Sequence, residues 1–226
     1  MEEITLLKQI PLFADMTDDQ LQSLAGAMGR RSYDRGQVIL RQGDEGHSLF
    51  VVISGRVRIY TLSPEGYELS VWICDEGAFF GEMALLTGEP RSASAEAMQP
   101  TEVLVLQRQA FRDFLLSNPQ AAVHTIEMLS RRLRHTTESL EALVSLNASE
   151  RVARQLLALL ERYGVEQEDG VLIDLDLSQE AIASLVGTTR ESANRALSSL
   201  RSQGIVQTDR SRIRVLQPKQ LQDLLY

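Results

Sequence analysis

The feature that most constrains the fold is a change of hydrophobic period along the chain. From Tyr33 to Leu106, short segments with the character of strands alternate with turns, and eight of the 14 glycines lie from Gly36 to Gly88. After Gln109, apolar residues recur at helical spacing. Many short strands closed by glycine turns favour a small barrel or sandwich over a parallel sheet. The expected strand segments are QVILR (37–41), SLFVVI (48–53), RVRIYTL (56–62), YELSVWI (67–73) and TEVLVLQ (101–107).

Helices are expected on both sides of this strand-rich region. Residues 1–30 are interpreted as short helices, because Thr17 and Gln20 have the spacing of a capping box. Pro119 is placed to open a long helix with a heptad seam, and so narrow a seam favours parallel dimerisation. The alternative is a helix packed on its own domain. The seam residues are Ile126, Leu129, Leu133, Thr136, Leu140 and Leu143.

A separate C-terminal domain is expected to begin at a second capping box, Asn147 with Glu150. It contains the strand-like segment VLIDLDL (171–177) and then two helical segments, LSQEAIASLVG (177–187) and TTRESANRALSSLRSQG (188–204). Gly187 is predicted to form the turn between them, and Thr188 with Glu191 to cap the second helix. A hairpin of IVQTD and RIRVL follows, with DRS at its turn. The pattern is that of a winged helix-turn-helix.

Composition excludes several classes of protein. No apolar run approaches the roughly 20 residues of a membrane span, and the acidic N-terminus MEEITLLKQI does not resemble a signal peptide, so we expect a cytoplasmic protein. A single cysteine, Cys74, disfavours iron–sulfur and structural zinc sites, and we expect no metal. No nucleophile paired with a base is visible, so we expect no enzyme. The net charge is −8, but residues 178–226 carry seven basic and four acidic side chains.

The second helical segment of the C-terminal domain, residues 188–204, has the chemistry of a DNA-reading helix. At its exposed start lie Arg190, Glu191, Asn194 and Arg195, which suit guanine and cytosine edges in the major groove. A basic hairpin with Arg210, Arg212 and Arg214 follows and supports DNA binding. The alternative is a solvated face, with Glu191 and Arg195 forming an i,i+4 pair that contributes only about 0.3 kcal/mol.

The segment FFGEMALLTGEPRSASA (79–95) is the most informative part of the strand-rich region. Arg91, if buried, needs an anionic partner, and the hydroxyls of Ser92 and Ser94 are able to share a phosphate with it. Glu82 suits a ribose hydroxyl. Together they describe a nucleotide with one diester charge. The alternative that the pattern leaves open is that Glu82 and Arg91 pair with each other.

Nearly the whole chain resembles the cyclic AMP receptor protein (CRP/FNR) family of bacterial regulators. FGEMALLTGEPRSA is similar to the family's phosphate-binding cassette, and TTRESANRAL resembles its reading helix. The resemblance implies an α+β fold: a jelly-roll-like β-roll (1–117), a dimerisation helix (118–146) and a winged helix-turn-helix (147–226). The implied ligand residues are Gly81, Glu82, Met83, Ala84, Arg91, Ser92, Thr136 and Thr137. The implied DNA residues are Ser178, Thr188, Thr189, Arg190, Glu191, Asn194 and Arg195.

The family's known activity predicts a homodimeric, cyclic AMP-responsive regulator. It implies binding to palindromes with TGTGA-like half-sites on double-stranded DNA and contact with RNA polymerase. Thr136 and Thr137 occupy the places where the cyclic AMP receptors contact adenine, although Ser92 also suits the guanine of cyclic GMP. His47, His124 and His135 do not form an obvious haem site. The alternatives are another effector, ligand-independent DNA binding, or a cyclic-nucleotide module that controls a protein partner.

Overall fold

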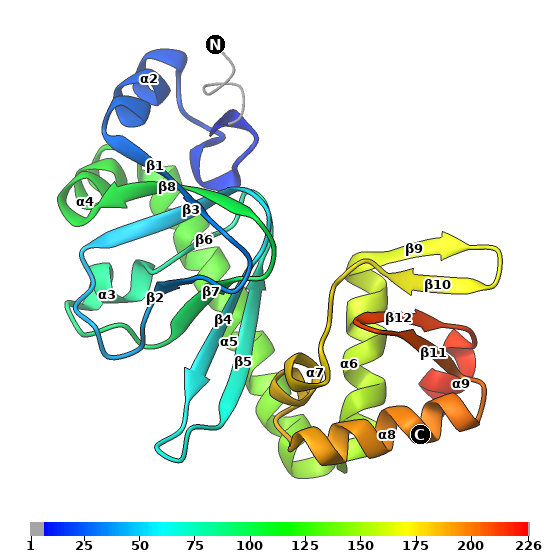
Figure 1. Cartoon of the computed structure of the whole chain (residues 1–226). Helices are drawn as coiled ribbons and strands as arrows, with labels where there is room; N and C mark the ends of the chain where they lie inside the picture. The colour runs from blue at the N-terminus through cyan, green and yellow to red at the C-terminus, as the bar shows by residue number, and fades with distance from the viewer. Residues whose placement is uncertain (1–6, 226) are drawn as a thin grey trace. The chain divides into compact units, whose positions relative to one another are not determined.

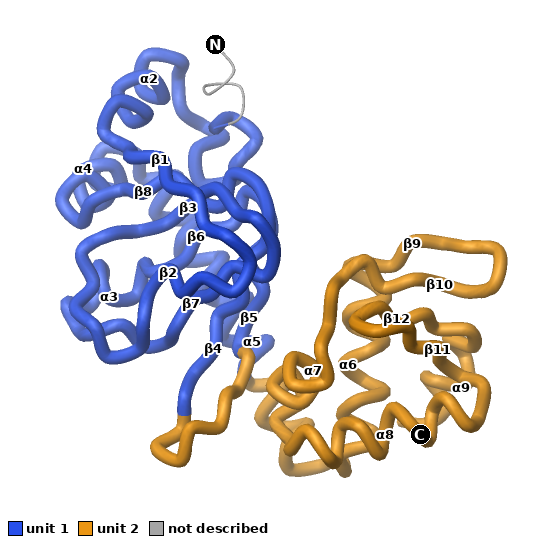
Figure 2. The backbone as a smooth tube through the Cα atoms, viewed as in Figure 1, with its two compact units in different colours: residues 1–62, 71–136 blue, residues 63–70, 137–226 orange. Residues whose placement is uncertain are grey.

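The structure, a computed structural model, describes residues 7–225. These residues form two compact units, shown in different colours in Figure 2. Unit 1 comprises residues up to 62 together with 71–136, and unit 2 comprises 63–70 and the chain from 137 onwards. No helix among the described residues is long and apolar enough to span a membrane.

Unit 1 is built on two antiparallel four-stranded sheets (Figure 1). One has the strand order β1-β8-β3-β6 and the other the order β2-β7-β4-β5. The strands are β1 (Met28–Tyr33), β2 (Val38–Leu40), β3 (Ser48–Ser54), β4 (Val57–Leu62), β5 (Glu68–Cys74), β6 (Phe79–Phe80), β7 (Ser94–Ala97) and β8 (Thr101–Gln107).

The central strands of the first sheet, β3 and β8, are buried on both faces, which explains their continuous apolar runs. Phe50 and Val103 belong to the core that includes residues of the second sheet, such as Cys74 and Ala95. The alternate residues of the same strands pack on a second core formed with the helices. These helices are η1 (Pro11–Phe13), α2 (Asp18–Gly26), α4 (Arg108–Ser117) and α5 (Pro119–Ser145), and the short helix α3 (Glu82–Thr87) follows β6.

These features confirm the predicted α+β class with an N-terminal β-roll. The capping box of Thr17 and Gln20 forms as expected, and α5 begins at Pro119. The interpretation of residues 1–30 as helical is wrong at its end, because β1 begins at Met28 and pairs with β8 from Leu106. This strand is mostly exposed and polar, so it lacks the apolar alternation by which strands are predicted. Residues 1–6 lie outside the described part.

Unit 2 contains the predicted helix-turn-helix and hairpin. Its sheet has the order β11-β12-β10-β9, and helices α6, α7 and α8 pack against one another. The capping box of Asn147 and Glu150 opens α6. The elements are α6 (Ala148–Tyr163), β9 (Gly164–Gln167), β10 (Gly170–Ile173), α7 (Gln179–Val186), α8 (Arg190–Ser202), β11 (Val206–Asp209), β12 (Arg212–Val215) and α9 (Pro218–Asp223).

The turn between α7 and α8 depends on Gly187. It adopts φ 63° and ψ 50°, which is the left-handed conformation that glycine accepts without steric cost. The predicted cap of the second helix is displaced by one residue. Thr189, rather than Thr188, is the N-cap, and its side chain accepts a hydrogen bond from the amide of Ser192. The backbone amide of Thr188 instead bonds to the carbonyl of Ala183, which makes it part of the turn.

Candidate ligand site and DNA-reading segment

The cassette segment places a buried carboxylate and a buried guanidinium at the start of α3. Gly81, the N-cap, has φ 84°, and a Cβ there would lie 2.7 Å from Nη1 of Arg91. Glycine is therefore required both for the backbone conformation and for the approach of Arg91. Arg91 is 7% exposed, and its Nη1 and Nη2 donate to the carbonyls of Gly81 and Ser48, each at 2.7 Å.

Glu82 is 2% exposed and does not pair with Arg91. Its Oε1 accepts a hydrogen bond from Nη1 of Arg132 on α5 at 2.8 Å. The other carboxylate oxygen, Oε2, is buried and has no hydrogen-bond partner in the described structure. The alternative of a Glu82–Arg91 pair is therefore not what forms. A buried acceptor without a partner is costly, so the site suits a ligand that brings a hydroxyl donor.

The electrostatic surroundings of Arg91 favour a monoanionic ligand. Burial lowers the pKa of its guanidinium from the ordinary value, since desolvation disfavours the charged form; the charge of Glu82 opposes this, and that of Arg108 adds to it. Asp44 also acts on Arg91 and raises its pKa. With Arg132, these groups comprise three cations and two anions. The surplus of one positive charge matches a phosphodiester.

Arg132 is a site residue that the sequence interpretation missed. It reaches Glu82 and the carbonyl of Phe79, and its guanidinium lies 5.9 Å from the centre of the Trp72 ring. Trp72 in turn makes an edge contact with His135, with ring centroids 5.0 Å apart. The signal was present in the sequence, because Arg132 precedes Thr136 by four residues and so shares its helix face.

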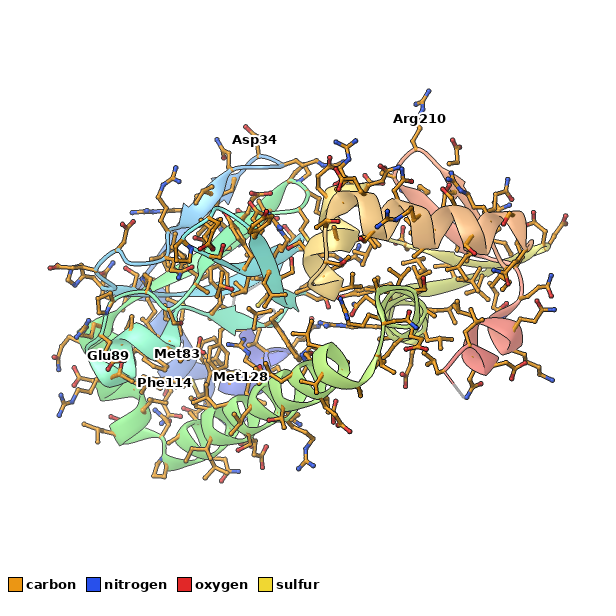
Figure 3. All side chains as sticks on the ribbon, turned by 90° about the horizontal axis from the view of Figure 1, so that it is seen from below. Asp34, Met83, Glu89, Phe114, Met128 and Arg210 are labelled. Carbon is orange, nitrogen blue, oxygen red and sulfur yellow. The ribbon has the colours of Figure 1, made fainter. Side chains whose placement is uncertain are left out.

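The remaining ligand candidates are more peripheral. Met83, which is labelled in Figure 3, is 48% exposed. Its sulfur accepts a hydrogen bond from the hydroxyl of Ser92 at 3.5 Å. Ala84 is buried, and its carbonyl accepts from Arg108 at 3.2 Å. The hydroxyl of Thr136 donates to the carbonyl of Arg132 at 2.9 Å. Thr137 is exposed and is the first α5 residue that belongs to unit 2.

The predicted base-reading residues lie together on the first turns of α8. Arg195 is exposed, and its Nη2 donates to the hydroxyl of Ser192 at 3.0 Å, so the Glu191–Arg195 pair of the alternative interpretation does not form. Ser192 competes for the guanidinium because it lies three residues away, within reach on a helix. Glu191 is exposed and, within the described residues, makes no hydrogen bond or ion pair. Both side chains are available to a partner molecule.

The other DNA candidates contact residues of α7 or cap the helices. Arg190 forms an ion pair with Glu180 at 2.8 Å, with both side chains more than half exposed. The side-chain oxygen of Asn194 accepts from Gln179 at 3.3 Å. Ser178 caps α7 by accepting from the amide of Ala181 at 3.1 Å.

The predicted basic hairpin is mostly neutralised. Arg212 pairs with Asp174 and Asp176, and Arg214 pairs with Asp169. These partners lie 36 to 45 residues away in sequence, so a count of basic residues along the hairpin overestimates its charge.

Comparisons with known proteins identify both domains. The family model for the cyclic nucleotide-binding domain matches residues 30–118, and that for the Crp-like helix-turn-helix domain matches residues 150–224. The cyclic AMP receptor protein of Thermus thermophilus is 33% identical over 220 residues, which is 97% of this chain and 99% of that protein. The CRP-like cAMP-activated global transcriptional regulator of Mycobacterium tuberculosis is 30% identical, with 92% of each chain covered.

Solved structures show the same architecture. The c-di-GMP responsive global regulator CLP of Xanthomonas campestris superposes with a TM-score of 0.78 at 25% identity, covering 88% of this chain and 99% of that one. The matched domains and the full-length relatives are those of transcription regulators and not of enzymes. The chain belongs to the cyclic AMP receptor protein (CRP/FNR) family of DNA-binding transcription regulators.

Proposed function

We propose that this regulator is a homodimer that binds cyclic AMP and, in response, binds palindromic DNA with TGTGA-like half-sites. The observation that carries the ligand half of the proposal is the buried pair of Glu82 and Arg132 beside Arg91, with Oε2 of Glu82 lacking a partner. A ribose 2′-hydroxyl supplies the missing donor, and a cyclic phosphate supplies one negative charge.

The position of Trp72 supports a nucleotide rather than a simple phosphate. Arg132 contacts both the carboxylate of Glu82 and the Trp72 ring. In a nucleoside the 2′-hydroxyl and the base are attached to adjacent ring carbons, so a ribose held by Glu82 brings its base within reach of Trp72. An aromatic surface is a suitable contact for any base, because every base has a π-face.

The choice of cyclic AMP depends on Thr136 and Thr137 and on the relatives. Two relatives whose names refer to cyclic AMP, from Mycobacterium tuberculosis and Thermus thermophilus, are 30% and 33% identical to this chain over more than nine-tenths of its length. The regulator from Xanthomonas is named as responsive to c-di-GMP, which makes that dinucleotide the main competitor. Cyclic GMP is the third candidate ligand, because the hydroxyl of Ser92 is exposed beside Met83.

The proposed dimer interface is the apolar seam of α5. Ile126, Leu133 and Leu140 are 63%, 68% and 58% exposed in the single chain. Large apolar side chains repeating at heptad spacing on an exposed face are typical of a helix that pairs with another. We propose a second copy of the chain as the partner.

Ligand-independent DNA binding is the second candidate function. It is favoured by the hydrogen bonds of Arg91 to two backbone carbonyls and by the Glu82–Arg132 pair, because these charges are largely satisfied within the protein itself. A regulator of this type would bind its DNA equally well with and without a nucleotide.

The test is calorimetric titration of the purified protein with cyclic AMP, cyclic GMP and c-di-GMP, followed by binding to a TGTGA palindrome. Because Trp72 is the single tryptophan of the chain, its fluorescence reports separately on ligand entry. Tight cyclic AMP binding that strengthens DNA binding supports the proposal. DNA binding with the same affinity in the presence and absence of all three nucleotides supports ligand-independent DNA binding. Transcription with added RNA polymerase then distinguishes activation from repression.

A further inference from the structure

One arginine of α6 joins the end of α5 to the turn of the helix-turn-helix. Arg151 lies near the start of α6 and is partly buried. Its Nη1 donates to the carbonyl of Leu146 at 2.8 Å, and its Nε donates to that of Val186 at 2.9 Å. Its Nη2 donates to the carbonyl of Gly187 at 3.3 Å. A single side chain therefore connects two segments that are distant from each other in the sequence.

The three carbonyls belong to the C-terminal ends of two helices. Helix α5 ends at Ser145, so Leu146 is the first residue beyond it, and α7 ends at Val186. The last carbonyls of a helix have no partner within the helix and carry a partial negative charge. Because a guanidinium holds its donors in a rigid planar fork, Arg151 fixes these two helix ends in both distance and angle.

Apolar packing supports the same junction. A Cβ built on Gly187 would lie 2.9 Å from Cδ2 of Leu143, so the last turn of α5 packs directly on the turn between α7 and α8. Ala142 of the same helix is buried. Arg190, the first residue of α8, follows Gly187 by three residues. The end of α5 and the start of α8 are thus held by contacts that all lie within unit 2.

We infer that Arg151 is a positioning residue that sets the separation of the two DNA half-sites that the dimer accepts. The inference rests on the proposed homodimer and its proposed binding to palindromic DNA. The seam residue Leu140 and the helix α8 both belong to unit 2, so a rigid junction between them fixes the reading helix relative to the proposed dimer interface. In a two-fold dimer the partner repeats this relation, and the two together determine the spacing of the half-sites.

The spacing of half-sites is a sensitive measure of this geometry. Each base pair added between two half-sites moves one of them by about 3.4 Å along the duplex and turns it by roughly 35° around the axis. A rigid junction tolerates such a displacement poorly, whereas a loosened junction lets α8 follow the displaced half-site. Loss of Arg151 is therefore expected to reduce the discrimination between spacings and to leave the binding of a single half-site unchanged.

The experiment compares Arg151→Met with the wild type by fluorescence anisotropy at saturating cyclic AMP. The duplexes are TGTGA palindromes whose spacer is shortened or lengthened by one base pair at a time, and a duplex with a single half-site. Arg154→Met is the matched control, because it removes the same charge from the same helix and Arg154 makes no hydrogen bond or ion pair within the described residues. Arg151→Lys keeps the charge without the planar fork. Thermal unfolding checks that each variant is folded.

The wild type is expected to prefer one spacing. Arg151→Met is expected to lower the ratio of affinities between the best spacing and its neighbours by roughly tenfold, which corresponds to the loss of one hydrogen bond to a charged group. Arg151→Lys is expected to have an intermediate ratio, and it decides the question if the methionine variant does not fold.

Three outcomes would overturn the inference: an unchanged ratio in the folded Arg151 variants, an equal loss in Arg154→Met, or single half-site binding that weakens as much as palindrome binding. Wild-type protein that binds palindromes of every spacing equally contradicts the inference and leaves the proposed function intact. Wild-type protein that binds no duplex even at low salt contradicts the proposed function itself.

Discussion

At the scale of single residues, the ligand site depends on where buried charges find partners. Arg91 donates to two backbone carbonyls, while Glu82 pairs with Arg132 and keeps one oxygen without a partner. Desolvation makes each of these charges costly when isolated, so they are retained only where something compensates them. Arg91 has further N–H donors beyond these two hydrogen bonds, and they are available to an anion at the cassette.

The variant Arg91→Ala is expected to weaken cyclic AMP binding by roughly 2 to 5 kcal/mol, because it removes the cation that meets a buried phosphate. Calorimetric titration measures this change. Arg112→Ala serves as the control, since Arg112 is exposed on α4 and makes no described contact. Arg91→Lys retains the charge and shows whether two-pronged geometry is needed. Unchanged affinity in Arg91→Ala would remove Arg91 from the ligand site.

At the scale of the elements, α8 and α5 each present one face to a partner. Buried residues of α8, among them Ala193, Leu197 and Leu200, pack within unit 2, while its polar first turns remain exposed. The apolar seam of α5 is exposed as well. Each exposed face is therefore expected to bind a partner molecule, and each expectation can be tested by substitution.

For α8, we expect Arg195→Ala to relax sequence specificity at one base pair by about 1 to 3 kcal/mol. The measurement is binding to the palindrome and to duplexes with a single substitution in each half-site. Arg201→Ala is the control on the same helix, because Arg201 hydrogen-bonds to Thr208 and Ser198. A uniform weakening over all duplexes would instead make Arg195 a phosphate contact.

For α5, we expect Leu133→Lys to raise the dimer dissociation constant by on the order of 100-fold, since an unpaired charge buried in the seam costs about 3 kcal/mol. Sedimentation velocity measures the change. Leu116→Lys places the same charge on another exposed apolar residue, which is 73% exposed on α4 and outside the seam. If both variants, or neither, dissociate, the seam is not the interface.

At the scale of the whole molecule, α5 is one of the places where the chain passes from one compact unit to the other. Within α5 the division falls between Thr136 and Thr137, the two residues proposed to meet the base. A ligand bound against this part of α5 is able to favour one conformation of the helix over another. Coupling of this kind is a free energy shared by the two binding events.

We therefore expect cyclic AMP to strengthen binding to the palindrome by about 5- to 150-fold, which corresponds to roughly 1 to 3 kcal/mol. By thermodynamic reciprocity, saturating palindrome must strengthen cyclic AMP binding by the same factor. Titrating each partner in the presence and absence of the other measures both factors. Equal affinities in both titrations would leave the two sites intact and eliminate the coupling.

The sequence by itself determined the elements whose signals are local. Capping boxes, Pro119 and Gly187 act through neighbouring backbone groups, so Thr17, Asn147 and the helix-turn-helix turn were predicted correctly. The apolar runs of β3 and β8 are equally local. The cassette was found by its resemblance to a family and by the chemistry of its residue types.

Only the tertiary structure decided which charges meet. Arg132 pairs with Glu82, which lies 50 residues away in sequence. Arg212 and Arg214 are neutralised by aspartates that lie 36 to 45 residues away. The exposed strand β1 likewise forms only because β8 provides its hydrogen-bond partners. The physical reason is the same in each case: periodicity and capping act within a few residues, whereas ion pairs and sheet pairing are fixed by distances that exist only after the chain has folded.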